Sequence, residues 1–198
     1  MPPAAKITKD AILDAGLSLI REQGPDALNA RALAARMHCS TQPIFSNFPS
    51  MDALRLALVA QADALYQART AAEIAQNRYP PYKASGMAYI RFAQEEPQLF
   101  RLLYMRDRQA ENESVQDSLT PQMISMVQQN TALNASQAGI FHLEMWAFVH
   151  GLAVLCATNF CPLDEDSISR MITDAFQGLK NRHERKEDDP CTPSKSRT

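Results

Sequence analysis

Glycine is scarce in this chain, with six glycines among 198 residues, whereas alanine and leucine are abundant. Ala and Leu are strong helix formers and Gly is a weak one, so this composition favours helix. No segment shows the strict alternation of apolar and polar residues that a half-buried strand needs, and no internal repeat is visible. We therefore predict an all-α fold of about nine helices, three short ones at the N-terminus and about six longer ones.

Long apolar runs are also lacking. None approaches the roughly 20 residues that span a bilayer, and the opening MPPAAKITKD has no apolar signal-peptide core. We expect a cytoplasmic protein without a membrane partner. The four cysteines are Cys39, Cys156, Cys161 and Cys191. The C-x4-C pair has no second Cys or His pair nearby to complete a zinc site, so we expect reduced thiols, no metal and no cofactor.

Acidic residues are absent between Ala27 and Met51, although the net charge of the whole chain is -2. Arg31 and Arg36 lie inside this window. A window without carboxylates suits contact with phosphates, but two arginines are a weak signal, and a chance gap explains it equally well.

Apolar periodicity and capping residues divide the chain into helices. Thr8, Asn29, Ser40 and Ser50 are suitable N-caps. The polar segment 106–114 is expected to be a loop, and the polar tail 184–198, which carries both charge signs, is expected to be disordered. The predicted helices span 8–23, 30–37, 41–47, 51–77, 82–95, a short segment from Pro97, 115–129, a segment from Asn134 or Ser136 to about residue 158, and 166–182.

The second and third predicted helices are separated only by the break HCS, and the first helix precedes them. Two short helices joined by such a turn form a helix-turn-helix. Pro43 falls in the first turn of the third helix, where its missing N–H costs nothing. The expected core of this unit is Leu33, Ala34, Met37, Cys39, Ile44 and Phe48.

The run AILDAGLSLIREQG…LNARALAARMHCSTQPIFSNFPSMDAL resembles the DNA-binding domain of TetR-family transcriptional regulators. The matching positions are Gly24, Leu33, Ala34, Ser40, Phe48, Asp52 and Leu54. The resemblance implies a DNA-binding domain over residues 1–50 and a ligand-binding and dimerisation domain over 51–183. It also implies a homodimer, whose last two long helices pack against those of the mate and whose two heads bind a palindromic operator in double-stranded DNA.

The resemblance also implies which residues face DNA. Thr41, Gln42, Ser46 and Asn47 lie on the exposed face of the third helix, where Gln and Asn can pair with adenine edges. Without the resemblance these would be an ordinary solvated surface, Phe45 would be free to pack, and Lys9 would be a solvated helix end. The predicted DNA-binding residues are Lys9, Asn29, Arg31, Ser40, Thr41, Gln42, Phe45, Ser46 and Asn47.

Three positions depart from the family pattern. His38 stands where Gly is usual in the turn, so its backbone must tolerate a left-handed conformation. Phe45 replaces a usual Tyr and Met51 a usual Lys, and in the family both of those side chains contact phosphate. Because phosphate contacts position a protein rather than read sequence, we expect weaker and less salt-sensitive DNA binding, not its loss.

A second region, EMWAFVHGLAVL, resembles the W-x-x-x-H-G signature of one C-terminal domain type in the family, and MAYIRFAQEEPQLFRLLYM fits the same type. His142, Trp146 and His150 fall four apart on one helical stripe. They are either a ligand-contacting or pH-responsive set or a buried Trp with two hydrogen-bonded histidines. Gly151 indicates a close helix approach, which favours the packing interpretation for His150.

Methionines and aromatic residues are frequent in the second part of the chain. They are typical of a plain core, but the resemblance implies an adaptable apolar cavity for a small-molecule effector. The residues predicted to contact this ligand are Phe92, Phe100, Tyr104, Met123, Met126, Phe141, Met145 and Trp146.

The sequence therefore predicts a homodimeric repressor that an apolar ligand releases from DNA by a population shift. The main alternative is a helical small-molecule sensor with weak or lost DNA binding, and nothing in the residues separates a repressor from an activator. An enzyme using His142, Glu144 or His150 is disfavoured, because no nucleophile–base pair or metal set accompanies them.

Overall fold

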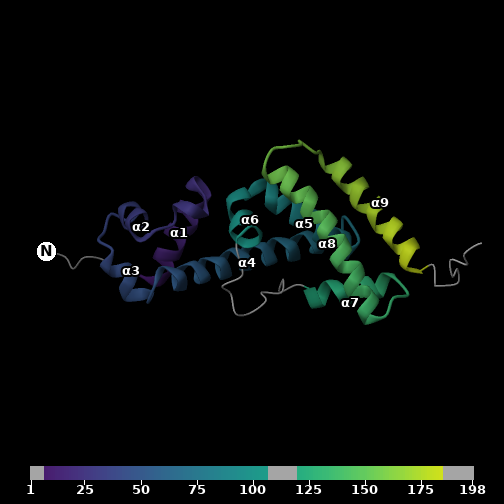
Figure 1. Cartoon of the computed structure of the whole chain (residues 1–198), viewed down its shortest axis with the longest axis horizontal. Coiled ribbons are helices and arrows are strands. Elements are labelled where there is room, and N and C mark those ends of the chain that lie inside the picture. The colour runs from purple at the N-terminus through teal and green to yellow at the C-terminus, as the bar shows by residue number, and fades with distance from the viewer. Residues whose placement is uncertain (1–6, 107–119, 185–198) are drawn as a thin grey trace, which may run out of the picture.

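The computed structural model describes residues 7–106 and 120–184, and within these ranges it confirms an all-α fold of nine α-helices without strands. Figure 1 shows the first helices gathered in a head at one end, a long helix leading out of it, and the remaining helices forming a body. The elements are α1 (Lys9–Gln23), the 3-10 turn η1 (Pro25–Ala27), α2 (Ala30–Arg36), α3 (Gln42–Asn47), α4 (Met51–Ala75), α5 (Pro81–Glu95), α6 (Pro97–Tyr104), α7 (Thr120–Asn130), α8 (Ala135–Ala157) and α9 (Glu165–Glu184).

Side-chain caps begin three of these helices at residues that the sequence predicts as caps. Thr8, Asn29 and Ser50 each accept a hydrogen bond from an amide of the first turn of α1, α2 and α4. Asn134 forms a capping box with Gln137 at the start of α8. The expected cap of α3 by Ser40 is wrong. Thr41 holds the N-cap position, its backbone is already helical, and its side chain makes no capping bond.

The turn between α2 and α3 has the left-handed residue that the sequence predicts. His38 has φ 52°, and the Cys39 amide donates to the Ala34 carbonyl at 3.0 Å, which closes the end of α2. This geometry is common for Gly and costs other residues more, with His among the more tolerant. The left-handed turn conformation is therefore adopted here by a histidine.

One continuous apolar core runs through the head and the body. Leu33, Ala34, Ile44 and Phe48 are buried in the head as predicted, while Met37 and Cys39 are only partly buried at its edge. Helix α4 belongs to both parts, because its first half packs on α1 and its second half packs on α5 and α6. A displacement of α4 therefore moves the head relative to the body.

Helix α8 packs against α5, α7 and α9 in the body. Among the described residues it is also the one helix long and apolar enough to cross a bilayer by length and composition, with a third (33%) of that stretch buried. Residues 107–119 and 185–198 lie outside the described ranges. Most of the predicted polar loop, the start of the helix predicted from 115, and nearly all of the predicted disordered tail fall there.

Candidate functional site

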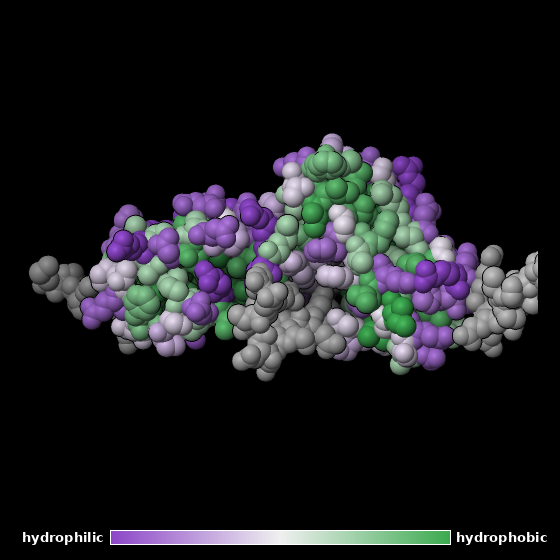
Figure 2. Space-filling model, in the orientation of Figure 1, coloured by the Kyte–Doolittle hydropathy of each residue, from purple (hydrophilic) through white to green (hydrophobic). Residues whose placement is uncertain are grey.

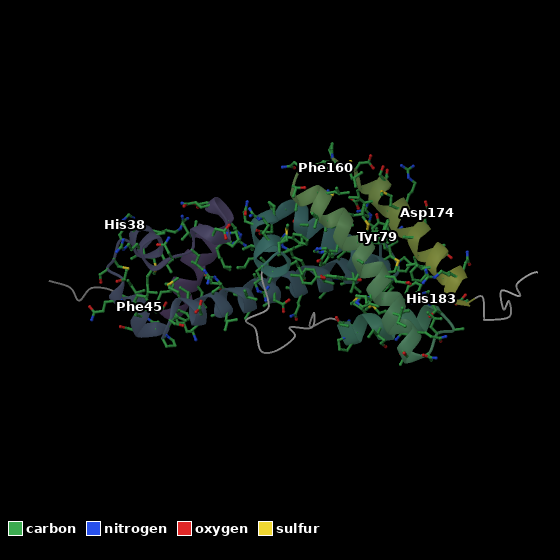
Figure 3. The ribbon with its side chains drawn as sticks, in the orientation of Figure 1. His38, Phe45, Tyr79, Phe160, Asp174 and His183 are labelled. Carbon is green, nitrogen blue, oxygen red and sulfur yellow. The ribbon has the colours of Figure 1, made fainter. Side chains whose placement is uncertain are left out.

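The end of the head exposes one face of α3 together with the preceding turn. Gln42, Phe45 and Ser46 are exposed on α3, and His38 and Ser40 are exposed beside them. Phe45 is a large apolar side chain with 48% of its surface accessible. Figure 3 shows His38 and Phe45 at the tip of the head, far from the body.

Several of the polar side chains predicted to contact DNA make hydrogen bonds within the head. The Asn47 amide donates to the Pro43 carbonyl at 2.8 Å, and the Ser46 hydroxyl donates to the Gln42 carbonyl at 2.9 Å. The Asn29 carbonyl oxygen accepts from two amides of α2 as its cap. Among the predicted residues of α3, Gln42 has the most freely available amide side chain.

The segment between Ala27 and Met51, which has no acidic residue, does not present a freely positive surface. A carboxylate from outside the segment pairs with one of its two arginines. The Arg36 guanidinium donates to both carboxylate oxygens of Glu22 at 2.7 and 2.5 Å and to the Ser18 hydroxyl at 2.7 Å. These bonds lower the pKa of Glu22 and raise that of Arg36. Arg31 is exposed and has no carboxylate partner in the described part of the chain, and Lys9 lies 5.2 Å above the Phe48 ring.

An ion-pair cluster joins the head to the body at the junction of α5 and α6. Glu96 lies between these two helices and receives hydrogen bonds from Arg21 of α1 and Arg69 of α4. Arg69 also donates to the neighbouring Glu95 at 2.8 Å. Glu96 is 12% exposed, so its carboxylate is largely enclosed by the two arginines and by apolar neighbours. The Glu96 carboxylate therefore links α1 and α4 to the junction of α5 and α6.

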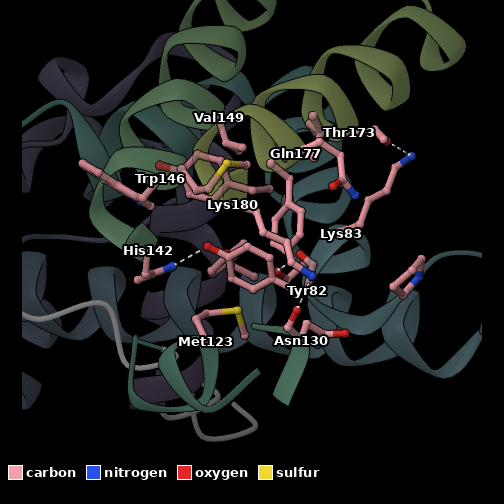
Figure 4. Close-up of a pocket in the computed structure, with 18 residues that line it drawn as sticks. Tyr82, Lys83, Met123, Asn130, His142, Trp146, Val149, Thr173, Gln177 and Lys180 are labelled. Atoms are coloured by element: carbon pink, nitrogen blue, oxygen red, sulfur yellow. Dashed lines mark hydrogen bonds between the residues drawn. The ribbon is translucent and has the colours of Figure 1, made fainter. Parts of the chain in front are cut away.

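The body contains a cavity of about 390 Å³ between α5, α8 and α9, with α7 at one end (Figure 4). This volume is within the range of roughly 300–1,000 Å³ found for small-molecule sites. The residues that line it are Tyr66, Pro80, Tyr82, Lys83, Ser85, Gly86, Tyr89, Met123, Asn130, His142, Met145, Trp146, Val149, Ile172, Thr173, Phe176, Gln177 and Lys180.

Three of the eight residues predicted to contact ligand line this cavity: Met123, Met145 and Trp146. The other five do not. Phe92, Phe100 and Phe141 are completely enclosed in the core. Tyr104 stacks in an aromatic cluster with Phe100 and Tyr89, and Met126 is half-buried on α7. Apolar periodicity alone does not separate a cavity wall from packed core.

Two tyrosine–histidine pairs connect α5 with α8. The Tyr82 hydroxyl lies 2.9 Å from His142 Nδ1, and the Tyr89 hydroxyl lies 2.9 Å from His150 Nδ1. Burial raises the pKa of Tyr82 far above its ordinary value and lowers the pKa of both histidines. Burial thus disfavours the charged form of both Tyr82 and His142, and the direction of the hydrogen bond between them depends on the tautomer of the histidine.

The histidine stripe of α8 has two environments. His142 lines the cavity, whereas His150 lies between the Trp146 ring at 4.9 Å and the Phe100 ring at 5.7 Å. The expectation that Gly151 marks a close helix approach is wrong within this chain. Gly151 is exposed, and no atom lies within 4 Å of where its Cβ would be.

The outer face of α8 is apolar and uncovered. Ile140 and Leu143 are 53% and 62% exposed, and Ala147 and Gly151 continue the stripe at helical spacing. Figure 2 shows apolar surface gathered over this helix. The small residues at its centre leave room for a second helix to approach closely.

Polar residues of the cavity were not found by sequence reasoning. Lys83 and Lys180 line it from α5 and α9, and no Asp or Glu is among the lining residues. The Lys83 ammonium donates to the Thr173 hydroxyl at 2.8 Å, and the Lys180 ammonium donates to the Asn130 carbonyl at 3.0 Å. Nothing in the local sequence around either lysine indicates a buried site.

Two family models match the sequence. Residues 12–58 match the model described as bacterial regulatory proteins, tetR family, and residues 82–176 match the model described as tetracyclin repressor-like, C-terminal domain. No curated protein matches the sequence.

Solved structures share the fold at low sequence identity. A TetR-like transcriptional regulator from Rhodococcus sp. RHA1 has a TM-score of 0.67 at 16% identity, over 90% of this chain and 98% of that one. The multidrug binding protein EbrR complexed with imidazole has a TM-score of 0.60 at 16% identity, over 83% and 87%. TetR-Q116A from Acinetobacter baumannii AYE in complex with minocycline has a TM-score of 0.60 at 16% identity, over 90% and 99%.

Proposed function

Because the chain belongs to the TetR family of regulatory proteins, we propose that it is a homodimeric transcriptional repressor of the cytoplasm, released from a palindromic operator by a small-molecule ligand with a largely apolar body. The observation that carries this proposal is the connection between the two candidate sites. Helix α4 begins beside α3 at Met51 and lines the cavity at Tyr66. A ligand that changes the position of α4 therefore changes the position of the head.

The proposed DNA contact is made by α3 and the first residues of α2. Gln42 is the principal base-reading side chain, because its amide is exposed and an amide can bond the adenine edge in the major groove. Arg31 and Lys9 supply positive charge for phosphates, and Thr41, Ser40 and Ser46 offer hydroxyls nearby. Asn29 and Asn47 hold the helices in place through their caps and internal bonds.

The proposed dimer forms through the uncovered apolar stripe of α8, with α9 beside it. Ile140 and Leu143 would be buried against the same residues of a second copy in a two-fold arrangement. Palindromic recognition needs this arrangement, because the two heads must enter successive major grooves about 34 Å apart. The same interface explains why α8 is apolar on both faces.

The first experiment is selection of binding sites from a random DNA pool, followed by gel-shift titration at two salt concentrations. We expect a palindromic site whose affinity falls as salt rises. Gln42→Ala should weaken this specific binding by about tenfold, since one bidentate base contact is worth roughly 1–3 kcal/mol. Gln122→Ala, on the exposed surface of α7, is the matched control and should bind as the parent does.

The alternative function, a ligand sensor with weak or lost DNA binding, has one observation in its favour. Phe45 exposes an apolar ring where the family pattern places a phosphate-binding tyrosine. Failure to select any sequence, from a protein that is dimeric and folded, would establish this alternative. A reporter gene downstream of the selected site then distinguishes repression from activation.

A further inference from the structure

The charges around the cavity indicate the chemical class of its ligand. We propose that the effector is an organic acid, with one carboxylate on an apolar body, and that Lys180 and Lys83 bind the carboxylate. This proposal rests on the function proposed above. The cavity is lined by two lysines and by no carboxylate, so a cationic ligand would meet only like charge.

Neither lysine has the close carboxylate partner that Arg69, Arg91 and Arg182 of the body have. Arg69, Arg91 and Arg182 each hold a carboxylate at 3.1 Å or less. The Lys83 ammonium instead bonds a neutral hydroxyl, and burial lowers its pKa. For Lys180 the carboxylate of Glu184 is 3.9 Å away, at the limit of an ion pair. Among the described residues, neither ammonium group therefore has a carboxylate oxygen closer than 3.9 Å, and a ligand carboxylate would supply one at hydrogen-bond distance.

The rest of the lining suits the apolar body of such a ligand. Met145, Val149 and Phe176 provide apolar walls, and Trp146 provides a flat aromatic one. Burial lowers the pKa of His142, which disfavours a positive charge on this ring deeper in the cavity. Figure 4 shows Lys83 and Trp146 on opposite sides of the cavity. The ligand therefore lies with its body towards α8 and its carboxylate towards the lysines.

The test compares three ten-carbon probes that differ only in their headgroup: decanoate, decanol and decylammonium. Trp146 is the single tryptophan of the chain and lines the cavity, so its fluorescence reports binding directly. Release of the protein from its selected DNA site, followed by fluorescence anisotropy of the DNA, is the second readout. We expect decanoate to bind at least tenfold more tightly than decanol, and decylammonium to bind most weakly.

Lysine variants show whether the preference comes from the proposed groups. Lys180→Gln should lose about tenfold in affinity for decanoate and leave the affinity for decanol unchanged, and Lys83→Gln should act in the same direction. Unchanged decanol binding also shows that each variant is folded. Arg170→Gln removes one positive charge from the same helix outside the cavity, and it should retain the preference for the acid.

Each alternative outcome has a distinct meaning. Equal affinity for decanoate and decanol, or tightest binding of decylammonium, overturns the acid proposal. Release of DNA by decanol would still uphold the proposed function in that case. No fluorescence change with any probe, together with no release of DNA, overturns both the acid proposal and the cavity as the effector site.

Discussion

Arg21 of the head and Glu96 of the body form two parallel hydrogen bonds, from Nε at 2.8 Å and from an Nη at 3.1 Å. This fork geometry fixes the guanidinium plane against the carboxylate more strictly than a single contact would. Arg69 of α4 donates to the same Glu96 oxygen that accepts the Arg21 Nη bond. The orientation of the head is thus connected to the helix that lines the cavity.

Replacing Glu96 with Gln should therefore weaken communication between the two sites. We expect a loss of roughly 1 kcal/mol of stability, since both arginines are about a third or more exposed and solvent screens the pairs. The ligand concentration that releases half of the DNA should rise, while the affinity of the cavity measured by Trp146 fluorescence stays the same. Glu95→Gln, which removes only the outer bond to Arg69, is the control. If Glu96→Gln and Glu95→Gln release DNA at the same ligand concentration, communication between the two sites does not pass through Glu96.

Gly24→Ala should destabilise the protein. Gly24 has φ 85° and ψ 165°, a conformation that residues with a Cβ rarely adopt, and an added Cβ would lie 3.1 Å from Gln98 Oε1 of α6. The expected cost is about 1–3 kcal/mol. Urea unfolding measures it, with Gly139→Ala in α8 as the control. That residue is helical and has only an ordinary contact at 4.0 Å, so alanine should be neutral or stabilising there.

Helix caps and turn conformations are the features of this fold that the sequence predicts well. Thr8, Asn29 and Ser50 are predictable as caps because a cap acts within one helical turn, and Asn134 is one of the two residues predicted to begin its helix. The His38 conformation was likewise predictable from the turn itself.

Contacts between distant segments were not predictable. The pair of Arg36 with Glu22 is 14 residues apart, and Lys83 and Thr173 meet across 90 residues. Similarly, Phe92 and Met145 are both apolar residues on helices, but only the packing of α5 against α8 and α9 decides which one faces the cavity.

Stability should fall as the pH is lowered from 7.5 to 5.5. Burial lowers the folded-state pKa of His142 and His150 below the ordinary value of 6.5. At pH values between the folded-state and unfolded-state pKa of these histidines, the unfolded chain binds more protons than the folded one. The free energy of unfolding therefore decreases as the pH falls through this range, and below it the contribution of the two neutral histidines is gone. Urea unfolding at both pH values measures the effect. His142→Asn should reduce the pH dependence, whereas His38→Asn, at the exposed turn, should leave it intact. A midpoint independent of pH would contradict this linkage.

Phe45→Tyr should strengthen DNA binding. The ring is about half exposed at the tip of the head, so a hydroxyl can be added without disturbing the core. A hydrogen bond to a charged group contributes about 1.5–3 kcal/mol, which predicts at least a tenfold gain in affinity. Gel-shift titration of the selected site measures it. Addition of Met51→Lys should make the salt dependence steeper by about one counterion. Unchanged affinity in both variants would place phosphate beyond the reach of these positions.

Leu143→Glu should convert the proposed dimer to a monomer. A carboxylate in the centre of the α8 stripe would be buried against its symmetry mate without a partner, which costs several kcal/mol. Sedimentation velocity measures the change in mass. Leu56→Glu on α4 is the matched control, because Leu56 is also exposed, at 58%, and lies away from the stripe. If the parent protein sediments as a monomer, the proposed interface is absent.

The length of α4 has a mechanical consequence. From Tyr66 at the cavity to Met51 at the head, the helix axis runs about 22 Å at 1.5 Å per residue. A tilt of about 5° around Tyr66 therefore carries Met51 sideways by about 2 Å over that lever arm. In a two-fold dimer the displacements are opposed, so the gap between the heads changes by about 4 Å, whereas a base-reading hydrogen bond tolerates a few tenths of an ångström. Under the proposed function, helix α4 amplifies a slight change in the cavity wall into a loss of register with the DNA.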